Sequence, residues 1–153
     1  VERVILAKLT TFMNNSGMAV ELIRNFYKID PSDIWIVHDE LDLPLGGMKI
    51  RFGGAAAGNH GVESIISALG TDKFWRFRLG IGEGQAKQIV RTNDGEEKRI
   101  TRQKVHHVEE FVLGKFTSHE KGKLKEITKT GSRALEAALE KGLKTAQNRF
   151  NTK

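Results

Sequence analysis

The chain has 153 residues, a net charge of +6 at pH 7 and no cysteine. The lack of cysteine excludes disulfides and thiolate chemistry, and no apolar run approaches the roughly 20 residues that a membrane helix needs. A hydrophobic fraction of 39% and a charged fraction of 29% are typical of a soluble globular protein, so we expect one cytoplasmic domain over residues 1–153. The excess of Lys and Arg favours polyanionic partners such as nucleic acid.

The first part of the chain alternates apolar strands with a helix. Residues 4–9 are apolar and rich in branched side chains, which predicts a buried strand. The turn at 14–17 supplies N-cap chemistry for a helix over 18–28, and residues 34–38 form a second buried strand. Helical spacing predicts that one face of the helix packs inward through Met18, Leu22, Ile23, Phe26 and Tyr27.

Two basic strands flank a glycine-rich loop in the middle of the chain. Residues 48–52 and 74–81 are the expected strands, and the loop at 53–58 leads into a helix over about 62–69. Basic side chains alternate along each strand, so each presents a basic face, formed by Lys49 and Arg51 in one strand and by Arg76 and Arg78 in the other.

The last part of the chain is helical. Residues 83–107, which precede it, are polar and without periodicity, and we expect a long hairpin or a mobile loop there. Thr117 and Glu120 have the spacing of a capping box, and Gly131 is a candidate interruption of the helix that follows. Its apolar stripe consists of Leu124, Ile127, Ala134, Leu135, Ala138, Leu139 and Leu143. The whole pattern predicts an α/β fold, a twisted, mixed and mostly parallel sheet flanked by helices, with helices at the C-terminus.

The glycine-rich loop invites a phosphate-binding interpretation, because small residues before a helix let backbone amides approach an anion. A Walker motif, however, needs Lys and Ser or Thr where this chain has Asn59 and His60. Binding of a nucleoside triphosphate is therefore disfavoured. A tight turn into the helix, or a loop that shapes a cleft around a larger substrate, remains open.

Ionisable side chains follow the strand at 34–38, at the end where open α/β sheets bind ligands. They are His38, Asp39, Glu40 and Asp42. A divalent metal site is disfavoured, because alternation along the strand sends His38 and Glu40 one way and Asp39 the other. Asp39 either orients a His elsewhere in the fold for acid/base chemistry or caps a turn.

Several motifs in register resemble the bacterial peptidyl-tRNA hydrolases. They are Thr11-Phe12-Met13-Asn14-Asn15-Ser16-Gly17, the run from His38 to Pro44, the basic positions Lys49 and Arg51, Arg78-Leu79-Gly80-Ile81-Gly82, the run from Phe111 to Phe116, and Asn148-Arg149. The resemblance covers nearly the whole chain. It implies hydrolysis of the ester between peptide and tRNA, which recycles tRNA for translation, by a monomeric enzyme without metal or cofactor.

The resemblance also implies a role for particular residues. Asp39 would orient the general-base His and stabilise its charged form. Phe12 and Asn14 would line the site that holds the tRNA end and the peptide near the ester, and the Phe111 region would form a lid. The contacts to tRNA phosphates would come from Lys49, Arg51 and Arg78.

The chain departs from the family pattern in two places. The family's loop has His before Asn, whereas Asn59 precedes His60 here. His60 therefore occupies the substrate-binding Asn position, and whether Asn59 takes over that role stays open. The family's first strand and its Thr-Arg-His-Asn segment, which carries the catalytic His, have no counterpart in this sequence. We therefore expect this sequence to lack the family's N-terminal portion and to be inactive alone.

A non-catalytic RNA-binding relative, of the kind that assists intron splicing in chloroplasts, is the alternative function. Asn14 and Asp39 favour the enzyme, because a surface that only binds RNA needs neither. His60 and the missing catalytic His favour the alternative; none of the chain's histidines, His38, His60, His106, His107 and His119, stands in the context of the family's catalytic one.

Overall fold

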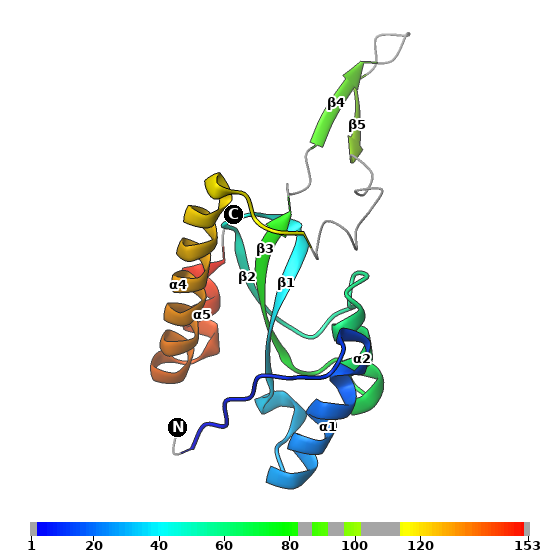
Figure 1. Ribbon diagram of the computed structural model, residues 1–153, viewed down its shortest axis with the longest axis vertical. Coiled ribbons are helices and arrows are strands. Elements are labelled where there is room, and N and C mark those ends of the chain that lie inside the picture. The colour runs from blue at the N-terminus through cyan, green and yellow to red at the C-terminus, as the bar shows by residue number, and fades with distance from the viewer. Residues whose placement is uncertain (1–2, 83–86, 92–96, 102–113, 152–153) are drawn as a thin grey trace.

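A mixed three-stranded sheet lies between two pairs of helices in the computed structural model (Figure 1). The structure describes residues 3–82, 87–91, 97–101 and 114–151. In chain order, with η marking 3-10 helices, the elements are η1 (Met13–Asn15), α1 (Ser16–Tyr27), η2 (Pro31–Asp33), β1 (Trp35–Pro44), β2 (Met48–Phe52), α2 (His60–Leu69), β3 (Trp75–Gly82), β4 (Lys87–Arg91), β5 (Glu97–Thr101), α4 (Ser118–Lys141) and α5 (Leu143–Phe150).

The sheet has the strand order β1-β3-β2. Strands β1 and β3 are parallel, with Trp35 opposite Trp75, and β2 pairs antiparallel with β3. The α/β class and the mixed sheet are therefore confirmed, although only one of the two pairings is parallel. The strand predicted at 4–9 is wrong: this segment lies outside any helix or strand, and Leu6 is 93% exposed. Apolar composition alone does not make a strand when no neighbouring strand takes up the backbone hydrogen bonds.

Helices α4 and α5 cover one face of the sheet. Met48, Ile50 and Phe77 of the sheet pack there against the apolar stripe of α4, including Ile127 and Ala134. The expected capping box at Thr117 is present, and α4 continues through Gly131 without interruption. The missing side chain of Gly131 faces Leu79 of β3, so this glycine is a contact point between helix and sheet.

Helices α1 and α2 form the layer on the other side, but α1 presents a different face from the predicted one. Val20 is buried, whereas four of the five predicted inward residues are exposed: Met18, Leu22, Phe26 and Tyr27. The backbone amide of Gly17 donates to Ser64 Oγ of α2 at 2.9 Å, and a side chain at position 17 would collide with the Ser64 carbonyl. This close helix contact, which the apolar pattern does not reveal, fixes the rotation of α1.

The hairpin predicted within 83–107 is confirmed where the structure describes it. Strands β4 and β5 pair antiparallel, with Lys87 opposite Thr101. The rest of that stretch lies outside the described residues, as do Phe111 and most of the lid that the resemblance implies. Within the described ranges, no helix has the length and apolar composition to cross a membrane.

Candidate active site

One face of the sheet collects the polar side chains that the sequence singles out. The strand register places six of them there: His38, Glu40, Lys49, Arg51, Arg76 and Arg78. His38 lies opposite Arg78 in the parallel pair, and Arg78 lies opposite Lys49 in the antiparallel pair. Ile36, on the same face of β1, packs against the apolar cluster of α1 and α2. The candidate site is therefore on the α1/α2 side, opposite the core under α4.

Arg78 forms a largely buried ion pair with Glu40 and is not a free basic group. Its Nε lies 2.8 Å from Glu40 Oε2, and the two side chains are only 14% and 7% exposed. The other oxygen of Glu40 accepts a hydrogen bond from the backbone of Asp42 at 3.2 Å. The sequence interpretation missed this role of Glu40, because alternation places Glu40 beside His38 on its own strand but does not say which strand pairs with it.

Lys49 and Arg51 are the strand cations that remain available for an anionic partner. Lys49 is half-buried and Arg51 is exposed. Neither forms an ion pair within the described part of the chain. The Arg51 guanidinium lies beside the backbone of Gly54, where a side chain on that glycine would collide with it. The basic strand thus borders the glycine-rich loop.

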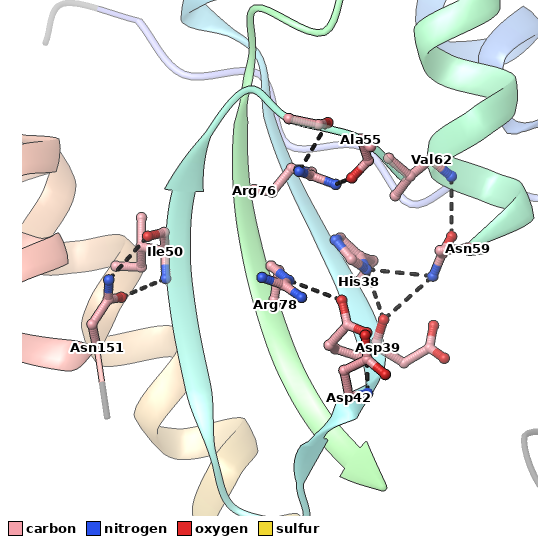
Figure 2. Close-up of polar contacts among 12 residues, drawn as sticks. His38, Asp39, Asp42, Ile50, Ala55, Asn59, Val62, Arg76, Arg78 and Asn151 are labelled. Atoms are coloured by element: carbon pink, nitrogen blue, oxygen red, sulfur yellow. Dashed lines mark hydrogen bonds and ion pairs between the residues drawn. The ribbon is translucent and has the colours of Figure 1, made fainter. Parts of the chain in front are cut away.

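Arg76 is not on the surface, contrary to the prediction that it forms part of a basic face of its strand. It is only 2% exposed, and its guanidinium donates to the carbonyl oxygens of Gly53 at 2.6 Å, Gly54 at 3.0 Å and Ala55 at 3.0 Å (Figure 2). The glycine-rich loop folds over this buried cation.

Asn59 joins the start of α2 to β1 (Figure 2). Its side-chain oxygen accepts from the Val62 amide at 3.0 Å, as an N-cap does. Its side-chain nitrogen donates to the Asp39 carbonyl oxygen at 3.3 Å and lies 3.4 Å from His38 Nδ1. His60, by contrast, is exposed and its Nδ1 lies 3.2 Å from Glu63 Oε2 on the surface of α2. Of the two loop candidates, Asn59 faces the sheet.

One ring nitrogen of His38 forms a hydrogen bond, and the other is buried without a hydrogen-bond partner among the described residues. Its Nδ1 lies 2.7 Å from the Asp39 carbonyl oxygen, so in the neutral ring we assign the proton to Nδ1 and leave Nε2 as an acceptor. That Nε2 is buried without a hydrogen-bond partner among the described residues. Burial lowers the pKa of His38, while the hydrogen bond to Asp39 and the charge of Glu40 partly oppose this shift in pKa.

The other predicted site residues lie around the start of α2 and in β1. Phe12 and Asn14 are exposed, and η1, which contains Asn14, packs against α2 where the Met13 sulfur faces Gly61. Asp39 lies within β1, and within the described ranges its carboxylate forms no hydrogen bond or ion pair. Among the described residues, the Asp39 side chain therefore caps no turn. No group of three or more metal-binding side chains occurs in the same ranges.

The family model for peptidyl-tRNA hydrolase matches residues 1–153. The peptidyl-tRNA hydrolase of Synechococcus sp. (strain JA-3-3Ab) is 38% identical over 95% of this chain and 57% of that relative. One from Chloroflexus aurantiacus is 38% identical over 98% of this chain and 71% of the relative. A crystal structure of peptidyl-tRNA hydrolase from Acinetobacter baumannii aligns with a TM-score of 0.72 at 29% identity, over 93% of this chain and 63% of that chain. The chain thus spans between 57% and 71% of the length of these proteins.

Proposed function

Because the chain belongs to the peptidyl-tRNA hydrolase family, we propose that it serves to hydrolyse the ester bond between a peptide and tRNA, as a cytoplasmic monomer. The observation that carries this proposal is the position of Asn59. Its amide links the start of α2 to the Asp39 carbonyl, in the sheet face that also carries Lys49 and Arg51. Asn59 thus brings a polar side chain to the backbone of Asp39, on the sheet face whose two cations form no ion pair among the described residues.

In this proposal two basic side chains of β2 bind the RNA, and the carboxylate of Asp39 takes part in hydrolysis of the ester. Lys49 and Arg51 contact tRNA phosphates, and Arg78 contributes less because Glu40 neutralises it. Phe12 and Asn14, beside the start of α2, hold the tRNA end, and Asn59 rather than His60 contacts the substrate.

The Asp39 carboxylate orients a general-base His, which removes a proton from water. The water oxygen then bonds to the ester carbonyl carbon, and the bond to the tRNA oxygen breaks as that oxygen takes a proton. The base is neither His38, whose free nitrogen is buried, nor His60, which points to solvent.

Hydrolysis and RNA binding, measured separately, test the two halves of the proposal. In the full-length protein, Asp39→Asn should lower kcat by about 10²- to 10⁴-fold while the Kd for tRNA stays within about twofold. Wild-type turnover in this variant would refute the role of Asp39. Hydrolysis of the ester by a protein limited to residues 1–153 would mean that one of its own histidines is the base.

The basic strand is tested by salt titration of RNA binding. Lys49→Ala and Arg51→Ala should each weaken tRNA binding and reduce the slope of log K against log salt by about 0.7–0.9. Arg133→Ala on the exposed surface of α4 removes the same charge away from the site and is the matched control. Equal effects of all three changes would show that net charge, rather than this strand, governs binding. Strong salt-dependent binding with no hydrolysis by the full-length protein would favour the RNA-binding alternative.

A further inference from the structure

The buried guanidinium of Arg76 has an unusual set of partners. It donates to the carbonyl oxygens of three consecutive loop residues, Gly53, Gly54 and Ala55. No carboxylate lies within ion-pair distance of it in the described part of the chain. The charge of Arg76 is therefore balanced mainly by backbone dipoles of the loop. The hydrogen bonds of Arg76 therefore hold the loop in place and do not form a binding site for a ligand from solution.

The loop depends on such contacts because its backbone is not regular. Positive φ angles occur at Gly53 (65°), Gly54 (91°), Ala57 (54°) and Gly58 (82°). Glycine gives access to these angles but also to many others, so a glycine-rich loop loses much conformational entropy when it adopts one shape. Besides the carbonyl contacts, the Gly54 amide donates to Asp72 at 2.8 Å.

The position of the loop determines the position of Asn59. The Asn59 amide donates to the Ala56 carbonyl at 3.1 Å, so the residue follows the fixed loop directly. From there its side chain reaches the Asp39 carbonyl oxygen at 3.3 Å. Because hydrogen bonds weaken steeply with distance, a shift of the loop of one ångström would break this contact.

We infer that Arg76 is a positioning residue of the candidate active site: it fixes the loop at 53–58 and thereby holds the Asn59 amide at β1. The inference rests on the proposed function for its catalytic consequence. Arg76 is too buried to touch RNA, so it acts only through Asn59. The planar guanidinium suits the role because it offers several donors in a rigid fork, whereas a Lys ammonium presents a single nitrogen.

The test compares Arg76→Lys, which retains the buried charge, with Arg76→Gln and with the control Arg133→Gln on α4. Amide hydrogen exchange at Gly54 and the NMR signals of the Asn59 side-chain amide report on the loop, and melting temperature reports on the whole fold. In Arg76→Lys, exchange at Gly54 should rise by about tenfold or more, because the loop opens more often. In the full-length protein, kcat/KM should fall by about 100-fold, while the Kd for tRNA stays within about twofold. The control should match wild type.

Wild-type exchange, Asn59 signals and kcat/KM in Arg76→Lys would overturn the inference. So would a fall in kcat/KM that is matched by an equal loss of tRNA binding, since a general structural defect would cause both. Should Arg76→Gln not fold, Arg76→Lys decides the question. If the full-length wild-type protein hydrolyses nothing, the proposed function fails, but the exchange and NMR measurements still decide whether Arg76 positions Asn59.

Discussion

The ion pair between Glu40 and Arg78 provides a prediction in which stability and RNA binding change in opposite directions. Glu40→Gln removes the negative charge, keeps the size of the side chain and keeps one acceptor oxygen for Arg78. The protein should become less stable because a buried cation loses its counter-charge. RNA binding should become stronger because the same cation is no longer neutralised.

The size of the stability effect follows from the geometry. The pair is 2.8 Å apart, with side chains 14% and 7% exposed, and breaking a buried pair of this kind costs about 3–5 kcal/mol. A hydrogen bond from the charged Arg78 guanidinium to the new amide oxygen recovers about 1.5 kcal/mol. We therefore expect a loss of roughly 1.5–3.5 kcal/mol in the free energy of unfolding, or roughly 3–14 °C in Tm for a domain of this size.

Urea unfolding and salt-dependent tRNA binding measure the two effects. Glu40→Gln changes the formal net charge from +6 to +7, and the slope of log K against log salt should steepen by about 0.7–0.9 if Arg78 now contacts a phosphate. Glu126→Gln, exposed on α4, makes the same charge change elsewhere and is the control. A free energy of unfolding within about 0.5 kcal/mol of wild type, or a coupling energy below that value in the double variant with Arg78→Met, would refute the reasoning.

Three further predictions concern the sheet and its surroundings. The folded-state pKa of His38 lies below its unfolded value, which is about 6.5. The neutral, buried His38 therefore contributes its full share to the free energy of unfolding above that pH, and this contribution is lost as pH falls through the lowered pKa. His38→Gln should therefore flatten the acid-side decline of the free energy of unfolding in urea titrations at several pH values, and an unchanged slope would contradict the shift. Gly82→Ala should destabilise by about 1–3 kcal/mol because a side chain there collides with the backbone of β1, whereas Gly122→Ala, with open space around it, should not lower Tm in calorimetry. Asn151→Ala removes two hydrogen bonds to the backbone of Ile50, so the Ile50 amide should exchange faster, and wild-type exchange would show that β2 does not need this contact.

The sequence predicts those parts of the fold that depend on local patterns. Alternation along 48–52 correctly places Lys49 and Arg51 on one face, and the Thr117 capping box correctly marks the start of α4. The inward face of α1 is wrong because close packing at Gly17 sets the rotation of that helix. A glycine that permits two backbones to touch leaves no periodic signal in the apolar residues.

The candidate site shows the same division between local and long-range information. The ionisable cluster in β1 and the glycine-rich loop are recognisable as sequence segments, and alternation along the strands puts Arg76 and Arg78 on one face. Alternation does not predict that both side chains are largely withdrawn from solvent. Arg78 meets Glu40 of the parallel strand, and Arg76 lies beneath a loop that begins 23 residues earlier. Such pairings are set by the tertiary fold.

The order of Asn59 and His60 has a physical explanation in the start of α2. An N-cap position favours Asn, because a short side-chain oxygen accepts a bond from the first turn, and Asn59 does so with Val62. The residue at the cap has extended backbone and precedes the helix, so its side chain can also reach back toward β1. The next residue, His60, has already entered the helix and points to solvent beside Glu63. The N-cap position is thus the reason why the side-chain amide of Asn59 faces β1. In a chain with the two residues exchanged, the Asn would be the first residue of the helix and would have to reach β1 from there.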